Sequence, residues 1–464
     1  MWHKQQLNKF TGALYRKLSS LIEYYIEKGL LLANEQLPSE RELAKRLQIN
    51  RSTVVNALEV LAERGILIRK IGSGTYVNAN KWGVLNRPII NWQLPAHFNY
   101  ELSTYQQKAN QLKLNQPNMC DLSNGDLPSH LIPTLTLPKL SAQELIFLEK
   151  NSHDLQLGLP SLKAEIAKYM QQQFSMQVNI NEILITSGTQ QALFLITQGL
   201  LKSGDAIGIE APSYFYSLQL FQAAGIRLYG IKMDKEGILI DELEAIHKKQ
   251  RLKWIFLNPI FQNPTGKVMS SQRKKQILEF CRQHYIGIVE DDAYSAINFD
   301  KIDNSPIKKY DKNNQVIYLG SLSKYLGKNI RIGWMIAPTN VIYKLSTIRQ
   351  HIDSGLSILP QLLAEEFLAH HYQAHLQLLI KSLKHKRNEL INWLTELDIT
   401  PNNYMLPRGG YHLYSKLSVT NKKQEDALLL NWLTNKIIVA KGENFGDDFG
   451  MVRLSFGHFK YFKE

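Results

Sequence analysis

The sequence predicts a multidomain protein: a small winged helix-turn-helix head followed by a larger α/β domain. The chain has 464 residues, which is too long for one ordinary hydrophobic core, so two or three domains are expected. Helical apolar repeats and a hairpin pattern fill residues 1–80. From about residue 118, strand-like and helix-like segments alternate, which is typical of an α/β sheet.

The composition indicates a globular protein with a polyanionic partner. Hydrophobic residues make up 44% of the chain, and the formal net charge of +14 favours a partner such as nucleic acid. The two cysteines, Cys120 and Cys281, are far apart, so neither a disulfide scaffold nor a metal site is expected. No apolar run reaches the ~18 residues of a membrane span, and the first residues lack a signal-peptide core. We therefore expect a cytoplasmic protein without a membrane segment.

The head begins with three predicted helices. The first carries an apolar face and ends at Gly29. That face consists of Leu14, Leu18, Leu21, Ile22, Tyr25 and Ile26. Ser39-Glu-Arg-Glu42 is a capping-box pattern that begins the second helix. Asn50 is expected to cap the third helix, which Gly65 ends.

Behind these helices, the glycine turn at residues 72–74 separates two strand-like runs, residues 66–71 and 75–77, which predicts a hairpin wing. Residues 1–80 contain 12 Lys and Arg against 7 Asp and Glu, a net charge of +5. Polar residues crowd the first turn of the third helix, where a recognition helix meets base edges and phosphates. These residues are Asn50, Arg51, Ser52 and Thr53. These residues therefore favour a DNA-binding domain over a helical bundle without a ligand.

In order and spacing, these motifs resemble the GntR-type winged-helix domain over residues 11–78. The resemblance is carried by Leu37-Pro-Ser-Glu-Arg-Glu-Leu-Ala44, Asn50-Arg-Ser-Thr-Val54, Gly65 and Gly72-Ser-Gly-Thr-Tyr-Val77. It implies DNA contacts from Arg41, Arg51, Ser52, Thr53 and Gly72. Asn50 stands where a Ser or Thr is frequent in that family, and it can still cap the helix or contact phosphate.

A linker is predicted over residues 79–117, because helical and strand periodicity is lost there and prolines interrupt the chain. Its aromatic residues indicate that parts of it dock on a domain surface. They are Trp82, Trp92, Phe98 and Tyr100. An alternative is that the final third of this stretch already belongs to the next domain, which we place at residues 118–464.

The large domain presents polar residues where its predicted strands end, which is where ligands bind in open α/β sheets. The strands are expected at residues 183–186, 206–210, 254–257, 286–291 and 316–320. After the last of them, Lys324 lies in a serine-rich turn, and its amine can form a Schiff base with an aldehyde. Asp291 can keep a pyridine nitrogen protonated. Asn263 and Tyr294 can hydrogen-bond a ring oxygen and lower the pKa of the Schiff base, and Tyr214 can stack on the ring.

A phosphate can be held by a second set of side chains, part of it at the start of the helix after residue 186. This set is Thr189, Gln190, Ser321, Ser323 and Arg331. Taken together, the strand ends supply each group that pyridoxal phosphate (PLP) requires.

These motifs resemble the fold-type I aminotransferases of class I/II over roughly residues 118–458. They are Ser187-Gly-Thr189, Pro212-Ser-Tyr214, Asn263-Pro-Thr-Gly266, Asp291-Asp-Ala-Tyr294, Ser321-Leu-Ser-Lys324, Arg331, Pro407-Arg-Gly-Gly410 and Arg453-Leu-Ser-Phe456. The resemblance implies a large domain with a small C-terminal subdomain, and an Arg453 that binds the α-carboxylate of an amino acid. His153 stands where the family has a tyrosine that reaches the partner subunit's cofactor phosphate. It either still donates across a dimer or loses that contact. The histidines of residues 369–375 are expected on a solvated helix face, without a metal.

A GntR-type head joined to an aminotransferase-like domain resembles the MocR subfamily of bacterial transcription regulators. The resemblance implies PLP at Lys324, a head-to-tail homodimer, double-stranded operator DNA as partner and an amino acid or amine as effector. Our first hypothesis is therefore a PLP-dependent regulator. The second is a working aminotransferase with an appended DNA-binding domain, which the completeness of the site supports, Asn263 included. The third is a cofactor-free dimerisation scaffold, against which Lys324 and Asp291 argue.

Overall fold

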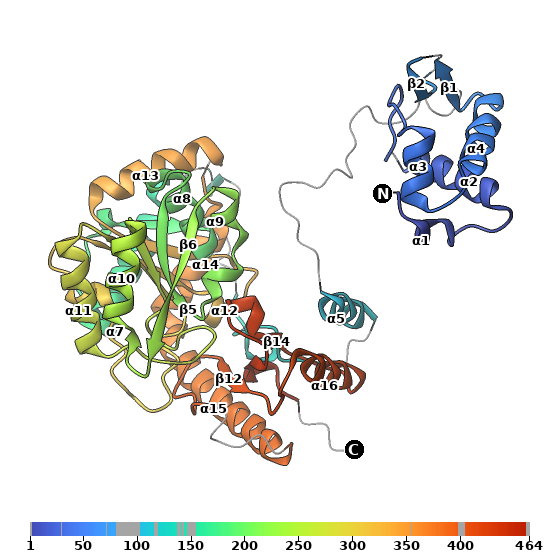
Figure 1. Cartoon of the computed structure of the whole chain (residues 1–464). Helices are drawn as coiled ribbons and strands as arrows, with labels where there is room; N and C mark the ends of the chain where they lie inside the picture. The colour runs from blue at the N-terminus through green and yellow to red at the C-terminus, as the bar shows by residue number, and fades with distance from the viewer. Residues whose placement is uncertain are drawn as a thin grey trace. The chain divides into compact units, whose positions relative to one another are not determined.

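The structure, a computed structural model, divides into two compact units, Met1–Tyr100 and Glu101–Glu464 (Figure 1). It describes residues 2–28, 30–70, 72–79, 103–115, 119–136, 141, 143–144, 146, 155–353, 355–397 and 404–460. Gly29, His153 and the linker aromatics at 82–100 lie outside the described residues.

The first unit is a winged helix-turn-helix. Its elements are α1 (Lys4–Leu7), α2 (Leu14–Glu27), α3 (Glu40–Leu47), α4 (Arg51–Glu63), β1 (Leu67–Lys70) and β2 (Gly74–Val77). The predicted apolar face of α2 is buried except at Leu14, which is the first residue of the helix and is 50% exposed. β1 and β2 form an antiparallel hairpin in which Leu67 pairs with Val77, and both side chains are buried in the core of the head.

The helix ends of the head confirm one predicted cap and correct another. The Ser39 hydroxyl accepts a hydrogen bond from the Glu42 N–H at 3.2 Å, as a capping serine does. The Glu42 carboxylate pairs with Arg46. Asn50 occupies the N-cap position of α4, but its side chain makes no capping hydrogen bond. Asn50 therefore has the predicted position, but the prediction that its side chain caps α4 was wrong, and that side chain is exposed.

The second unit is built on an eight-stranded sheet of order β4-β11-β10-β9-β8-β5-β6-β7. The strands are β4 (Ile183–Thr186), β5 (Ala206–Ala211), β6 (Arg227–Asp234), β7 (Gly237–Ile238), β8 (Trp254–Leu257), β9 (Gly287–Asp292), β10 (Val316–Ser321) and β11 (Gly333–Ile336). All five strands predicted from the sequence are present. β5, β6, β8, β9 and β10 run parallel, whereas β11 is antiparallel to both β10 and β4, and β7 is antiparallel to β6.

Helices cover both faces of this sheet (Figure 1). The helices of the large sheet's layers are α7 (Pro160–Phe174), α8 (Gly188–Leu200), α9 (Gln219–Ala223), α10 (Ile240–Gln250), α11 (Ser271–Gln283), α13 (Thr339–Ile352) and α14 (Ile358–Glu366). The short α12 (Ser323–Leu326) follows β10, and α15 (Tyr372–Glu396) lies beside β12 (His412–Lys416) (Figure 1). Phe256 of β8 packs in one core with α8 and α13, whereas Ile255 and Leu257 pack in another with α10 and α11. Because successive side chains of a strand point to opposite faces, β8 is buried on both.

A smaller C-terminal part completes this unit. It holds the three-stranded sheet β12-β15-β14 and the parallel pair β13-β3. Its elements are β3 (Cys120–Asp121), β12 (His412–Lys416), α16 (Lys422–Thr434), β13 (Ile437–Ile438), β14 (Ala440–Lys441) and β15 (Met451–Ser455). The sequence therefore predicted the fold class correctly: a winged helix followed by an α/β domain with a C-terminal subdomain.

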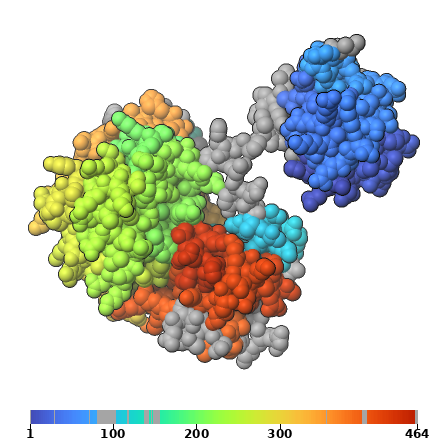
Figure 2. All heavy atoms as spheres, viewed as in Figure 1, coloured from blue at the N-terminus to red at the C-terminus, as the bar shows by residue number. Residues whose placement is uncertain are grey.

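Part of the predicted linker forms a helix, α5 (Thr104–Asn115), that belongs to the second unit. The Tyr105 hydroxyl donates a hydrogen bond to the Val439 carbonyl at 3.1 Å and accepts one from the Val439 N–H at 2.9 Å. Figure 2 shows α5, in cyan, against the red C-terminal segments. The helix in the final third of residues 79–117 therefore belongs to the next domain, as the alternative interpretation proposed. Its buried residues are Tyr105 and Ala109.

The histidine-rich segment is only partly a solvated face. His370 and His371 are exposed and lie 3.9 and 3.4 Å from the Glu366 carboxylate. His375 is half-buried, and its ring packs against Phe367.

Within the described ranges, no group of three His, Cys, Asp or Glu side chains could hold a metal ion. No helix among the described residues is long and apolar enough to cross a membrane. Both cysteines are buried free thiols.

Candidate functional site

The carboxyl ends of the parallel strands border a cavity of about 280 Å³. Every residue that the sequence predicts for the cofactor lines it, and so does Arg453. They are Thr189, Gln190, Tyr214, Asn263, Asp291, Tyr294, Ser321, Ser323, Lys324 and Arg331. These residues lie at the ends of five different strands or in the segments that follow them, so only the sheet brings them together.

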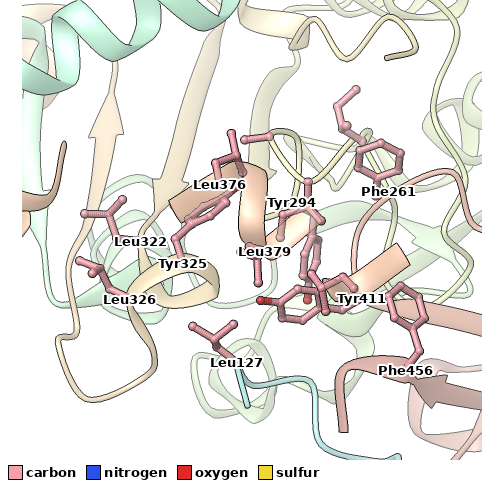
Figure 3. Close-up of a cluster of buried hydrophobic side chains, with 14 of the residues drawn as sticks. Leu127, Phe261, Tyr294, Leu322, Tyr325, Leu326, Leu376, Leu379, Tyr411 and Phe456 are labelled. Atoms are coloured by element: carbon pink, nitrogen blue, oxygen red, sulfur yellow. The ribbon is translucent and has the colours of Figure 1, made fainter. Parts of the chain in front are cut away.

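Lys324 enters the cavity from α12, directly after β10. Its neighbours Tyr325 and Leu326 are buried and pack with Leu379 of α15 (Figure 3). The Lys324 amine donates a hydrogen bond to the Gly125 carbonyl at 2.7 Å, and the Tyr411 hydroxyl donates one to the Lys324 carbonyl at 2.5 Å. The lysine is therefore fixed at both its backbone and its amine.

Burial lowers the pKa of Lys324 from 10.5 to about 8; Asp126 and Asp291 oppose this effect, and Arg453 adds to it. A neutral amine is the nucleophile that attacks an aldehyde, and lowering the pKa makes the neutral form of this amine more accessible than that of an ordinary lysine. The electrostatics of the cavity thus prepare Lys324 for Schiff-base chemistry.

Asp291 lies at the end of β9 and is almost fully buried. Its Oδ2 accepts a hydrogen bond from the Tyr214 hydroxyl at 2.9 Å, whereas its Oδ1 is buried without a hydrogen-bond partner among the described residues. Burial raises the pKa of this carboxyl to about 6, partly offset by the Tyr214 hydrogen bond. A buried carboxylate oxygen with a free lone pair suits a cationic N–H, such as that of a pyridinium ring.

Arg453 and Asn263 hold each other at another wall of the cavity. Arg453 donates from Nη1 to the Asn263 side-chain oxygen at 3.0 Å and from Nη2 to the Ser123 carbonyl at 2.6 Å. The Asn263 N–H donates to Asn258 Oδ1 at 2.7 Å, and Asn258 Nδ2 donates to the Asp291 carbonyl at 2.7 Å. Asn258 therefore ties the loop of Asn263 to the end of β9.

The N-terminus of α8 and the turn after β10 form an anion-binding corner. Thr189 and Gln190 lie in the first turn of α8, where N–H groups and the helix dipole favour a phosphate. Ser321 Oγ accepts a hydrogen bond from the Ser323 N–H at 3.1 Å. Arg331 is exposed at the rim of the cavity, with a left-handed φ of 53°.

Several lining residues were not predicted from the sequence. Gly125 and Asp126 lie in the segment after β3, and Asp126 pairs with Lys328 at 3.1 Å. No motif marked them. Asn258 also lines the cavity, and its place immediately after the apolar strand β8 was a signal that could have revealed it.

In the head, a concave surface between α3, α4 and the wing is lined by three of the predicted DNA contacts, Arg41, Arg51 and Gly72. The other three are on the start of α4: Asn50 and Ser52 are exposed, and Thr53 is half-buried. A carboxylate that the sequence did not single out, Glu40, also lines the surface.

Glu40 connects the recognition helix to the wing. Arg51 donates from Nε and Nη2 to Glu40 Oε2 at 3.2 and 2.9 Å. Arg69 of β1 pairs with the other carboxylate oxygen. One acidic side chain therefore orients two arginines on a surface of the kind that meets DNA phosphates and base edges.

The cavity fits PLP in its chemistry. It offers an amine of lowered pKa at Lys324, an unpaired carboxylate oxygen at Asp291 and an anion-binding corner at Thr189, Ser321 and Arg331. The ring would lie between these groups, with Asn263 and Tyr294 also lining the space.

Known proteins share both parts of the chain. Residues 14–77 match the family model of bacterial regulatory proteins of the gntR family, and residues 117–460 match aminotransferase class I and II. The chain is 33% identical to the uncharacterized HTH-type transcriptional regulator YdfD of Bacillus subtilis, over 96% of this chain and 92% of the relative. It is 31% identical to the HTH-type transcriptional regulator NorG of Staphylococcus aureus, over 91% of this chain and 95% of the relative.

Solved aminotransferases share the fold of the second unit. An archaeal alanine:glyoxylate aminotransferase is 28% identical, with a TM-score of 0.67 over 77% of this chain and 91% of that one. The multiple substrate aminotransferase of Thermococcus profundus is 26% identical, with a TM-score of 0.66 over 78% and 92%. The chain therefore belongs to the HTH-type transcriptional regulators in which a GntR-family DNA-binding domain precedes an aminotransferase class I and II domain.

Proposed function

We propose that this protein is a PLP-dependent transcriptional regulator of the MocR type, whose aminotransferase-like unit senses an amino acid or amine through a Schiff base at Lys324. The observation that carries the proposal is the presence of both modules in one chain: a concave surface with oriented arginines in the head, and a cavity lined by all ten residues that the sequence predicts for the cofactor. Bound PLP would supply an aldehyde for Lys324 and an electron-withdrawing ring.

The residues of the cavity suggest how an effector would be detected. Arg453 would take the carboxylate of an amino acid, which requires that Arg453 leave or share its hydrogen bond to Asn263. The effector amine would replace the Lys324 amine, whose hydrogen-bond acceptor is the Gly125 carbonyl. Gly125 lies in residues 119–136, the next described segment after α5. Different contacts of this segment in the two states would provide the differential free energy that a switch of DNA affinity needs.

The test combines absorbance with DNA binding. Amino acids and amines are screened for a change in the visible spectrum of the PLP-loaded protein, and active compounds are then added to gel shifts with the DNA upstream of the protein's own gene. We expect Lys324→Ala to lose the spectral change and the effect of the compound on DNA binding. Lys344→Ala, an exposed lysine of α13, is the matched control and should respond like the wild type. An effector response that persists in Lys324→Ala would contradict the sensing model.

As a second candidate we propose a working aminotransferase of amino acids with an appended DNA-binding domain. Two observations favour it: Arg453, which would bind the substrate carboxylate, contacts Asn263, and Asp291, which would pair with the cofactor ring, has a free oxygen in the same cavity. Repeated turnover of an amino acid with a keto acid would support this activity. A single conversion of the cofactor without turnover would leave only the regulator hypothesis. A spectrum without any PLP absorbance after loading would instead favour the cofactor-free scaffold.

We also infer a head-to-tail homodimer that binds double-stranded operator DNA. A dimer would let two recognition helices read two half-sites, which one head cannot do. Light scattering coupled to size-exclusion chromatography measures the oligomeric state, and a monomer at micromolar concentration would argue against it.

A further inference from the structure

A layer of polar groups lies behind Tyr294, on the three-stranded sheet of the C-terminal part. His412 begins β12 and Ser455 ends β15, and the two residues are direct partners in this antiparallel pair. Arg453 is two positions before Ser455, so both side chains point to the same face of the sheet. The sheet that supplies Arg453 to the cavity therefore also brings His412 and Ser455 toward it.

His412 contacts both of its polar neighbours through its ring. Its Nε2 lies 3.1 Å from the Tyr294 hydroxyl, and its Nδ1 lies 3.0 Å from the Ser455 hydroxyl. All three side chains are buried. A Cβ on Gly125 would stand 3.1 Å from the His412 ring, so a glycine leaves room for it. The Gly125 carbonyl accepts the hydrogen bond of Lys324, which places the chain of contacts beside the reactive amine.

The charged groups around His412 help to decide whether its imidazole is protonated. Lys324 of α12 and Arg453 of β15 are the nearby cations, while Asp291 of β9 and Asp126 of residues 119–136 are the anions. Burial, followed by Arg453 and Lys324, holds the pKa of His412 well below its usual value. The imidazole is therefore neutral and has one N–H donor and one acceptor nitrogen.

Each tautomer of His412 leaves one hydroxyl proton without an acceptor, either that of Ser455 or that of Tyr294, and of these two residues only Tyr294 lines the cavity, where a bound acceptor can take the proton. Among the described residues, the Ser455 hydroxyl has no other hydrogen-bond partner than His412, so its proton is satisfied only by donation to Nδ1. The remaining N–H, on Nε2, then donates to the Tyr294 oxygen. Since Tyr294 accepts from His412, its own proton is free to be donated into the cavity.

We propose that Ser455 and His412 form a hydrogen-bond relay that makes Tyr294 a donor to the cofactor ring oxygen, and that this relay sets the pH at which the Lys324 Schiff base loses its proton. The inference rests on the proposed function, because it requires PLP at Lys324. A hydrogen bond donated to the ring oxygen withdraws negative charge from it, so that the Schiff base holds its proton less tightly. His412 and Ser455 act through Tyr294 and are positioning residues.

The test is a pH titration of the visible absorbance of the PLP-loaded protein. We expect His412→Phe to raise the midpoint by about one pH unit, the size of one hydrogen bond, and Ser455→Ala to raise it by roughly half as much. His412→Gln, which keeps an N–H near the position of Nε2, should stay closer to the wild type than His412→Phe. Ser415→Ala is the matched control: it removes a hydroxyl from β12 on the opposite face of the sheet and should not move the midpoint.

A cofactor-free measurement keeps the inference testable if a variant binds PLP poorly. Imidazole nitrogen-15 shifts of histidine-labelled protein, assigned through His412→Gln, should show His412 protonated on Nε2, and Ser455→Ala should populate the other tautomer. Equal midpoints in wild type, His412→Phe and Ser455→Ala, or an Nδ1–H tautomer in the wild type, would overturn the relay alone. A wild type without any PLP absorbance would overturn the proposed function as well.

Discussion

The head carries its DNA-facing side chains on the outside, whereas the large unit carries its reactive groups inside a cavity. The Arg51 side chain is 56% exposed, and its partner Glu40 comes from the adjacent helix. Asp291 is buried and Lys324 is half-buried, and the groups around them come from positions up to 330 residues apart, such as Ser123 and Arg453. Exposed ion pairs contribute about 0–1 kcal/mol and are screened by salt. Buried groups instead have strongly shifted pKa values. DNA binding by the head should therefore respond mainly to salt, and cofactor binding in the cavity mainly to pH.

The largest effect should come from removing the charge of Asp291. Asp291→Asn keeps the acceptor for Tyr214 but cannot pair with a pyridinium nitrogen, so we expect PLP affinity to fall roughly 10- to 100-fold. Equilibrium titration with PLP measures it, and Asp300→Asn, an exposed aspartate, is the control. DNA affinity of the cofactor-free protein should not change. Unchanged PLP affinity would show that the free Oδ1 is not a cofactor contact.

The same variant should stabilise the cofactor-free protein at neutral pH. Burial raises the pKa of Asp291 from 3.8 to about 6, so the folded state binds this proton more tightly than the unfolded state. Its contribution to stability is present below pH 3.8 and is lost as the pH rises through about 6. Asp291→Asn should therefore be about 2–3 kcal/mol more stable than the wild type near pH 7 and equal to it near pH 4. Urea unfolding of the large unit at several pH values measures this, and parallel curves would contradict it.

In the head, Arg51→Ala should weaken operator binding roughly tenfold, the effect of losing one arginine contact. Arg46→Ala is the control, because this exposed arginine of α3 pairs with Glu42 and does not line the concave surface. The PLP spectrum should be the same in both variants. If the two variants bound DNA equally well, the concave surface would not be the recognition surface.

The smallest effect should follow from Glu40→Gln, which frees Arg51 and Arg69 from their shared carboxylate. We expect tighter binding to random DNA, a salt dependence steeper by about one unit and a few-fold loss of preference for the operator. Glu59→Gln changes the net charge equally and removes only the longer contact to Arg69, at 3.4 Å. Fluorescence anisotropy at several salt concentrations compares them. If Glu40→Gln and Glu59→Gln bound DNA identically, Glu40 would act only through its negative charge and not by orienting the two arginines.

Much of the site could be predicted from the sequence because its motifs are local. Lys324 and Asp291 lie at the ends of apolar strands, and every predicted cofactor residue lines one cavity. The prediction of a side-chain cap at Asn50 was wrong because the residue type shows only that a cap is possible. In the structure the Asn50 side chain makes no capping hydrogen bond to α4. The α5 helix was missed because its weak apolar pattern becomes informative only where Tyr105 meets Val439.

The sequence by itself determined five of the eight strands of the large sheet, the three main helices of the head and the residue types at the strand ends, since periodicity and turn residues act over a few positions. Only the tertiary structure decided which polar groups became partners: Tyr214 with Asp291, Arg453 with Asn263, and His412 with Tyr294. The physical reason is that these contacts depend on the order and register of strands that are distant in the chain. A hydrogen bond forms only when such pairings bring donor and acceptor within about 3 Å.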